Sequence, residues 1–484
     1  MEQTTQVNDQ YSGRSVSVED VIYPTTSDEV RNLVLRASAM KKPLYFVSGG
    51  RNWGYGSGLP VQDGSTLISL EKMNQIISFD RELGVIEIEP GVTQGQLERY
   101  LDENGLNYYV PNTGAGPDGT IVGNALERGF GMAPIENHAQ GLLCVDGFLA
   151  DGTPYQSALS EVNPKLGSCF PMGIGPSLDA FIPQSSWLVV TKAKVQLIRR
   201  TEVCDVMILP FARHEFGQVA DLLQQLSARI DLPTGGFKIL NQRQLQHTLN
   251  DLPDVVRRFT PRSDWTLAFF IRSSKRLRRP ICSEVAQIIK DLKFDQHCSR
   301  WSDGKIGRAQ KLVSLLPSSW RSLLQTPLID LAELHRLGDG RTSMIGHKIL
   351  KPEHGLLWLS PLCPLSSKDI GALTRIVDRW ERMSADNKLP FQIATQTWTV
   401  LNQRTIALVL PLLFPLGTPL DFIHKSYAHM LEELRQHGFS PYRFPSDTMP
   451  YVTEMIAPRY FSLIQRIENA LDPDRVINAH RYHA

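Results

Sequence analysis

The chain has few cysteines, and they follow no recognisable pattern. Six are scattered through 484 residues, with no Cys-x-x-Cys pair and no cluster of cysteine and histidine. This spacing argues against a disulfide framework and against a zinc site. We therefore expect buried, reduced thiols and no metal.

An excess of charge and a long apolar run are also missing. Fifty-one basic residues face fifty acidic ones, a net charge of +1, which argues against binding to nucleic acid or to a membrane surface. The longest apolar run, 406–416, is interrupted by Pro411 and Pro415 and is too short to cross a bilayer. It predicts a buried strand and a turn. The polar first residues show no apolar signal core, so the expected location is cytoplasmic.

What the chain does have is a glycine-rich stretch directly after a short apolar run. Five of the eleven residues in 48–58 are glycine, and the apolar residues 44–47 precede them. The spacing is neither the Gly-x-Gly-x-x-Gly of a dinucleotide-binding helix nor a P-loop. Bare glycine amides can surround an anion such as a pyrophosphate. The alternative is a simple turn, which is the commoner case for such a stretch alone.

Two helices are predicted in the N-terminal part, each opened by a capping box. Thr26 with Glu29 opens a helix over 26–40, and Thr93 with Gln96 opens one over 93–104. Strand-like runs cover 42–47, 66–70, 85–89 and 188–198.

A second glycine-rich stretch, 111–131, lies between these strand-like runs. Two glycine loops, each beside a strand, suggest two walls of one ligand cleft. The alternative is two unrelated surface loops, and glycine content alone favours it.

The middle of the chain, from about 201 to 430, alternates strand-like and helix-like segments and reads as a separate α+β domain. The strand-like segments are 203–209, 265–271, 355–359 and 405–410, and the helix-like ones are 215–230, 283–292 and 368–383. The basic cluster 275–279 is interpreted as a solvated surface, with a docking patch for an acidic redox partner as the alternative. An amphipathic helix, 457–470, follows in the C-terminal part.

Taken together, these pieces resemble the flavoproteins of the vanillyl-alcohol oxidase and p-cresol methylhydroxylase family. Residues 48–56 are similar to its FAD pyrophosphate loop, 121–129 to its second FAD segment, 184–192 to the strand that ends its FAD domain, and 471–481 to its C-terminal return to the flavin. The resemblance implies an α+β fold. A two-subdomain FAD-binding domain would be formed by both chain ends (16–200 and 431–484), with an α+β cap domain over 201–430.

The resemblance also implies FAD as the cofactor, and it assigns residues to it. The expected cofactor-binding residues are Ser48, Gly49, Gly50, Arg51, Asn52, Trp53, Gly54, Pro90, Gly91, Gly114, Gly119, Thr120, Gly123, Asn124, Gly131, Val190, Asn478 and Arg481.

Three residues match the family's phenolate site: Tyr55 in the first glycine loop, and the pair Tyr442-Arg443. In the relatives, two tyrosine hydroxyls and a guanidinium converge on the phenolic oxygen of the substrate. A positive charge and two donors keep that phenol ionised, and a phenolate lets hydride leave the benzylic carbon readily. The alternative is that Tyr55 packs on the flavin and that Tyr442-Arg443 is a structural pair.

One departure concerns the residue expected beside the flavin. The relatives carry an aspartate before the second glycine segment, where this chain has Asn112. An amide can donate and accept hydrogen bonds but cannot take a proton as a carboxylate can. Glu127 is the nearest carboxylate in sequence, and we assign it a structural role.

Two further departures concern the cap and the pocket. The relatives often link flavin covalently through a cap histidine or tyrosine, and the corresponding residue here is Leu356, with His354 two residues away. We therefore expect non-covalent FAD. A tyrosine-rich segment of the relatives is replaced by 132–138, in which His138 is interpreted as structural.

The predicted function is an FAD-dependent oxidoreductase of a phenolic or related aromatic substrate, in a tailoring or a catabolic role. It would remove hydride from a benzylic, allylic or alcohol carbon and pass electrons to oxygen or a redox carrier. One alternative oxidises a non-phenolic alcohol or hydroxy acid, with Arg443 holding a carboxylate. Another is a redox-inactive flavin-binding subunit. A homodimer is the assembly considered.

Overall fold

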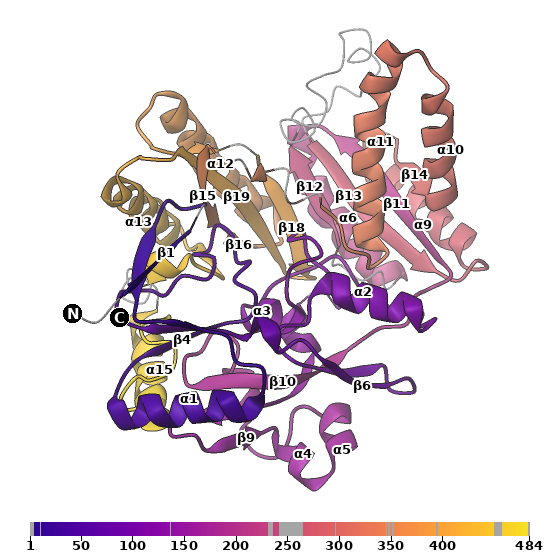
Figure 1. Ribbon diagram of the computed structural model, residues 1–484. Helices are drawn as coiled ribbons and strands as arrows, with labels where there is room; N and C mark the ends of the chain where they lie inside the picture. Colours follow the sequence, from indigo (N-terminus) through magenta and orange to yellow (C-terminus); the bar gives the residue numbers. More distant parts are fainter. Residues whose placement is uncertain are drawn as a thin grey trace.

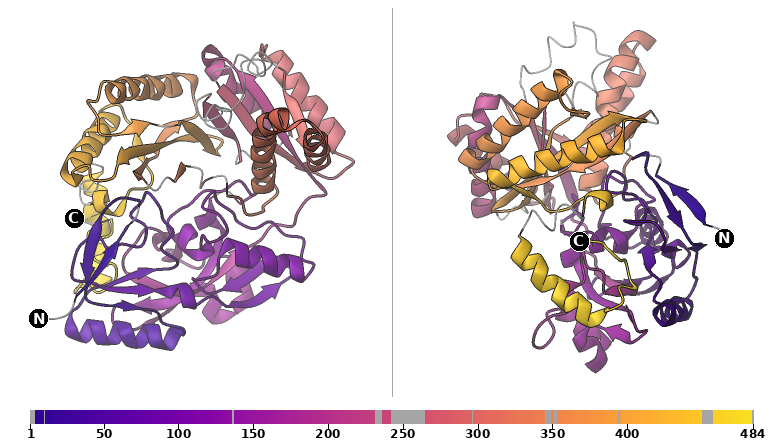
Figure 2. Two further views of the ribbon diagram at one scale, coloured as in Figure 1. Left: turned by 45° about the horizontal axis from the view of Figure 1, so that its top comes forward. Right: turned by 90° about the vertical axis from the view of Figure 1, so that its left-hand side faces the viewer.

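The computed structural model describes the chain in two layers that lie on each other (Figures 1 and 2). We call the lower one the FAD part and the upper one the cap, after the domains that the resemblance predicts. None of the described helices is both long and apolar enough to cross a bilayer. The described residues are 4–9, 11–135, 137–230, 236–241, 265–295, 297–344, 346, 349–350, 353–393, 395–449 and 457–482.

The first subdomain of the FAD part holds a parallel sheet in the order β3 (Val21–Ile22), β5 (Thr66–Ser69) and β4 (Leu44–Val47). Helix α1 (Ser27–Met40) packs on it through its buried apolar side chains. The Thr26 hydroxyl accepts a hydrogen bond from the Glu29 N–H, as the capping box predicts. The antiparallel pair β1 (Thr5–Asn8) and β2 (Ser15–Val18) lies beside this sheet.

The second subdomain is an antiparallel sheet in the order β6-β7-β10-β8-β9, with α2 (Gln94–Glu103) packed against it. Thr93 caps α2, as predicted. The sequence analysis missed β6, β8 and β9. The strands are β6 (Ile76–Asp80), β7 (Val85–Ile88), β8 (Leu142–Leu149), β9 (Pro154–Gln156) and β10 (Leu188–Gln196), and the short helices are α3 (Ile121–Leu126), α4 (Ala158–Val162) and α5 (Pro164–Cys169).

The C-terminal segment returns to β4, the strand that leads into the first glycine loop. After α15 (Pro458–Leu471), the Asp472 carboxylate accepts hydrogen bonds from two backbone N–H groups, those of residues 476 and 477, each at 2.8 Å. Asn478 then donates its N–H to the Leu44 carbonyl at 2.8 Å, and its side-chain oxygen accepts the Phe46 N–H at 2.7 Å. The two ends of the chain are therefore bonded at the strand that positions the loop.

The cap is a ten-stranded sheet in the order β14-β11-β13-β12-β18-β19-β16-β20, with β15 and β17 also paired to β19. Its strands are β11 (Val203–Phe211), β12 (Lys238–Asn241), β13 (Trp265–Ser273), β14 (Ser299–Ser302), β15 (His354–Leu359), β16 (Pro361–Pro364), β17 (Gln392–Ile393), β18 (Thr397–Asn402), β19 (Thr405–Pro415) and β20 (Ser440–Pro441).

Helices cover the cap sheet unequally. One face forms the largest apolar core with helices α6 (Phe216–Ile230), α9 (Arg278–Asp291), α12 (Ser367–Ala385) and α13 (Leu420–Gln436). On the other face α11 (Ser318–Gly338), next to α10 (Asp303–Ser314), packs against the region of β11 and β13. The part of that face over β12, β18 and β19 contributes residues to a cavity shared with the FAD part.

One expectation needs correction, and one domain boundary is revised as a proposal. The run 406–416 does not turn at Pro411: β19 is one strand through Pro415, and Pro411 pairs with Trp358 of β15. Pairing to a neighbour thus outweighs the local strand-breaking tendency of proline. Helix α13 runs across residue 430, and β20 still pairs with the cap strand β16. We therefore propose that the cap ends beyond Pro441 and not at 430.

Candidate functional site

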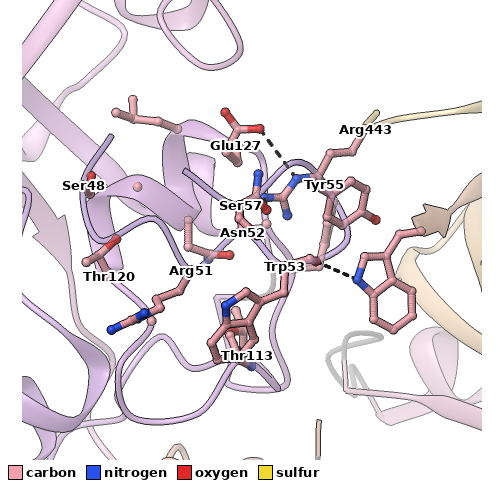
Figure 3. A pocket seen from close by; sticks show the side chains of 18 of the residues that line it. Ser48, Arg51, Asn52, Trp53, Tyr55, Ser57, Thr113, Thr120, Glu127 and Arg443 are labelled. Carbon is pink, nitrogen blue, oxygen red and sulfur yellow. Dashed lines mark hydrogen bonds and ion pairs between the residues drawn. The ribbon is translucent and has the colours of Figure 1, made fainter. Parts of the chain in front are cut away.

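A cavity of about 410 Å³ lies between the FAD part and the cap (Figure 3). Both glycine loops, β10 and the C-terminal return line it from below, and residues of β12, β15, β18 and β19 line it from the cap. The two glycine stretches are therefore walls of one cleft, and the alternative of two unrelated loops is wrong.

Two glycines show why the loops need residues without a Cβ. Gly123 lies so close to the first loop that a Cβ there would be 2.7 Å from Thr120 Oγ1 and 2.9 Å from Ser48 Oγ. Gly54 has φ +73°, and a Cβ there would be 2.4 Å from the ring of Trp358. The glycines thus let the two loops and the cap close on one another.

Most of the residues expected to bind the cofactor line this cavity, together with the three residues of the expected phenolate site. The lining residues from the prediction are Ser48, Gly49, Gly50, Arg51, Asn52, Trp53, Gly114, Gly119, Thr120, Gly123, Asn124, Val190, Asn478, Arg481, Tyr55, Tyr442 and Arg443.

Five predicted residues are not brought to the cavity wall: Gly54, Pro90, Gly91, Gly131 and Asn112. A Cβ on Gly91 would lie 2.6 to 2.7 Å from three backbone carbonyl oxygens, and one on Gly131 would lie 2.3 Å from the Asn112 carbonyl. These two glycines allow close backbone packing behind the cavity.

The donors around the cavity fit an anionic, elongated cofactor such as FAD. The hydroxyl groups of Ser48, Thr113 and Thr120 and the guanidinium of Arg51 lie around the two glycine loops (Figure 3). Gly123 lets the second glycine stretch pack directly against Ser48 and Thr120, which brings the backbone N–H groups of both loops to one wall, an arrangement that suits a diphosphate.

The phenolate-site residues form one cluster. The Arg443 guanidinium lies 4.5 Å from the centre of the Tyr55 ring and donates from Nη2 to the side-chain oxygen of Asn52. The Tyr55 hydroxyl is 2.9 Å from Ser360 Oγ, at the junction of β15 and β16. The Tyr442 ring meets Phe130 edge to face at 5.4 Å. Burial raises the pKa of both tyrosines, with Arg443 opposing the rise, so both hydroxyls remain protonated donors.

Glu127 joins the phenolate cluster to the C-terminal return. Its carboxylate lies 3.6 Å from Arg443 Nε (Figure 3). It also pairs with Arg481 Nη2, and the Tyr482 hydroxyl donates to it at 3.4 Å. Gln184 supports the same corner by donating to the Tyr442 carbonyl at 3.1 Å. The structure agrees with a structural role for Glu127, and it adds the two arginines that this carboxylate orients.

Asn112 is fully buried, and its amide is engaged by the cap. Its Nδ2 donates to the carbonyls of Leu337, at 2.9 Å, and Arg341, at 2.7 Å, at the end of α11. Its Oδ1 has no hydrogen-bond partner among the described residues. These contacts tie the second glycine stretch to the cap, and a catalytic role for Asn112 stays a prediction.

His138 is a buried neutral side chain. Its Nδ1 accepts a hydrogen bond from the Asn124 amide, and burial lowers the pKa of the imidazole to about 4. These contacts fit the structural role expected for His138. Glu136, of the same segment, lies outside the described residues.

Three residues at or beside the cavity carry contacts that the sequence analysis did not predict. Trp358 lines the cavity and stacks on Tyr55 with ring centres 6.5 Å apart, Lys238 lines it from β12, and Ser360, behind the cavity wall, lies within hydrogen-bond distance of the Tyr55 hydroxyl. The alternation of 237–241 could have placed Lys238 opposite the apolar face of its strand, but its position over the cleft depends on distant strand pairing.

Comparison with known proteins agrees with this geometry. A family profile described as an FAD binding domain matches residues 18–156. The 1'-carboxy-chondrochloren decarboxylase of Chondromyces crocatus is 26% identical over 96% of this chain and 90% of its own length. The flavoprotein subunit of 4-cresol dehydrogenase (hydroxylating) of Pseudomonas putida is 24% identical over 94% of this chain and 85% of its own.

The crystal structure of p-cresol methylhydroxylase with substrate bound shares the fold. Its TM-score is 0.84 at 21% identity, and the match covers 98% of this chain and 91% of that one. The fold, the FAD-binding profile and the relatives that align along nearly the whole chain agree with the two glycine loops around one cleft. The chain is an FAD-dependent oxidoreductase that shares its fold with p-cresol methylhydroxylase.

Proposed function

We propose that this enzyme removes a hydride from a benzylic or allylic carbon of a phenolic substrate. The observation that carries the proposal is the cluster of Arg443, Tyr55 and Tyr442 in the same cavity as the residues expected to hold FAD. The relative named 4-cresol dehydrogenase supports a phenolic substrate.

FAD, when bound, supplies the two-electron acceptor. The side chains of this chain act on the phenolic oxygen. A guanidinium beside that oxygen lowers the pKa of the phenol, and the phenolate supplies electrons to the para carbon as hydride leaves, which yields a p-quinone methide. Tyr55 and Tyr442 remain protonated, because burial raises their pKa, and can therefore donate hydrogen bonds to the phenolate.

Anaerobic mixing with single substrates tests this proposal. A p-alkylphenol should bleach the bound flavin faster than a hydroxy acid such as lactate. Faster bleaching by the hydroxy acid would favour the non-phenolic alternative, with Arg443 holding a carboxylate. Reoxidation by air, compared with reoxidation by an artificial redox carrier, identifies the electron acceptor.

We further propose that the FAD is held without a covalent bond. Leu356, at the expected attachment position, lines the cavity, whereas His354 does not. Among the described residues that line the cavity there is no histidine or cysteine. After acid precipitation the yellow colour should stay in the supernatant, and colour that stays in the pellet would contradict the proposal.

A second candidate is oxidative decarboxylation of a phenol with a carboxylate on the carbon next to the benzylic one. The relative named 1'-carboxy-chondrochloren decarboxylase favours it. Hydride loss would again yield the p-quinone methide. The electron pair of the C–CO₂⁻ bond would then form a carbon–carbon double bond and restore the phenolate, releasing CO₂. One alkene and one CO₂ per flavin reduced would support this candidate, and an alcohol product would exclude it.

A further inference from the structure

The cap wall of the cavity carries a lysine in a row of three residues on neighbouring strands. Lys238 of β12 pairs in register with Thr399 of β18, which pairs with Ala407 of β19. All three line the cavity. Their neighbours Ile239 and Trp398 point to the opposite face and lie in the helix-covered core, as the alternation of strands requires. The strand pairing therefore fixes the direction of the lysine.

The ammonium group of Lys238 has only a neutral partner in the described part of the chain. Its Nζ donates to Thr399 Oγ1 at 2.6 Å, and no ion pair joins it to a described carboxylate. Burial lowers the pKa of Lys238 to about 8. Lys238 is half-buried in the cavity wall, and a cation withdrawn from water without a counter-charge is stabilised when a ligand supplies the anion.

The carboxylate that shares the cavity is already engaged. Glu127 is the acidic residue among the described lining residues, and it pairs with Arg443 and Arg481. Arg443 belongs to the phenolate cluster, and Arg481 lies on the C-terminal return. Lys238 is thus a separate positive site, on the cap.

Sheet geometry separates Lys238 from the phenolate cluster. Trp358, which stacks on Tyr55, pairs with Pro411 of β19, four residues along the strand from Ala407. Four residues correspond to about 13 Å along β19, and β12 lies two strands from β19, about 10 Å across the sheet. The backbone positions of Trp358 and Lys238 are separated by these two distances, and the extended lysine side chain reaches across part of that separation. A substrate that fills it needs a phenol at one end and a short side chain at the other.

We propose that Lys238 binds a carboxylate on the side chain of the phenolic substrate. This inference rests on the proposed function, because the phenol end is assigned to Arg443 and the two tyrosines. It makes a p-hydroxyphenyl acid the preferred substrate class. Lys238 would then determine specificity, and Thr399 would position its ammonium group.

Two matched ligands test the proposal: 3-(4-hydroxyphenyl)propanoate and its amide, which differ in charge and hardly in shape. Binding is measured by calorimetry on the dithionite-reduced holoenzyme, in which turnover cannot occur. The wild type should prefer the acid. Lys238→Met should weaken acid binding roughly 10- to 150-fold, the worth of one charge-assisted hydrogen bond, and leave amide binding unchanged. Lys238→Arg keeps the positive charge and should retain part of the preference for the acid over its amide.

Control variants separate this role from others. Lys388→Met removes an exposed lysine that pairs with the nearby Asp386, and it should bind both ligands as the wild type does. Thr399→Val leaves the lysine in place and should reduce the preference for the acid. Equal binding of acid and amide by the wild type would overturn the proposal. So would loss of FAD from Lys238→Met with the acid preference retained, because the lysine would then serve the cofactor.

A second pair of ligands keeps this inference separable from the proposed function. 3-Phenylpropanoate and its amide lack the phenolic hydroxyl. If these bind as tightly as the phenols, the phenolate site is refuted. Preference for 3-phenylpropanoate over its amide, lost in Lys238→Met, would still support the carboxylate site.

Discussion

Replacement of Arg443 by methionine is the sharpest test of the phenolate site. Methionine keeps much of the length of the side chain but removes the charge and its donors. Arg443 is 9% exposed and lies against the Tyr55 ring. If it holds the phenolate, its loss removes a charge-assisted hydrogen bond worth about 1.5–3 kcal/mol. That corresponds to roughly 10- to 150-fold weaker phenol binding.

The same change should move the pH profile of the reaction. An opposite charge within hydrogen-bond distance lowers the pKa of an acid by about 1–3 units. Without Arg443 the bound phenol should therefore ionise at higher pH, and the rate of flavin reduction should rise to its plateau about 1–3 pH units later. A role for Arg443 in folding alone would not produce this shift.

The cost to stability should stay moderate because Glu127 keeps other partners. Arg481 and Tyr482 still contact the carboxylate after Arg443 is lost. The free energy of unfolding should therefore fall by less than the about 3–5 kcal/mol that an abandoned buried charge costs.

The assay is anaerobic stopped-flow reduction of the flavin by 4-ethylphenol across a pH series, with FAD content measured beside it. Arg443→Lys keeps the positive charge but lacks the planar guanidinium with its paired donors. Its phenol affinity and its rate of flavin reduction should lie between those of the wild type and Arg443→Met. Arg435→Met serves as the matched control, because Arg435 is exposed on α13 and pairs with Glu432. Affinity within twofold of wild type and an unmoved pH profile would refute the phenolate assignment.

Two other predictions follow from single contacts. Gly123→Val should abolish FAD binding, because the valine side chain would collide with Thr120 and Ser48. A purified variant with full flavin absorbance would contradict the claim that close packing at Gly123 is needed for the FAD site. His138 ionises near pH 4 when folded and near 6.5 when unfolded. The unfolded state therefore binds more protons between these values, and stability should fall by up to about 3 kcal/mol as pH drops from 6.5 to 4. In thermal melts at several pH values His138→Gln should flatten this dependence, and an equally steep loss in the variant would show that other groups cause it.

Local patterns predicted the framework of the site well. The hydroxyl caps at Thr26 and Thr93 form as expected, because a hydroxyl and an N–H three residues apart meet without help from the rest of the chain. The strand before the first glycine loop is also present, at Leu44–Val47. Such features need only short-range information.

The contacts that sequence reasoning could not foresee depend on long-range pairing. Pro411 ends a strand by local rules, yet β15 pairs along β19 on both sides of it. Asn112 was matched to a catalytic carboxylate by position, while its amide bonds to carbonyls more than 200 residues away. The residues next to Pro411 or Asn112 in the sequence do not indicate these distant partners.

Glu127 is a long-range contact that connects the residue proposed to hold the substrate phenolate with a residue expected to bind the cofactor. A single carboxylate orients Arg443, which is assigned to the substrate, and Arg481, which is assigned to the cofactor side of the cavity. The two oxygens of one carboxylate offer a limited number of acceptor positions, and here both cations share them. A phenolate that draws Arg443 toward itself would release part of Glu127 to Arg481, so substrate binding and the C-terminal return would be coupled through this carboxylate. Coupling of this kind requires the buried setting of the triad, because exposed charges at the same distances would be screened by water and salt.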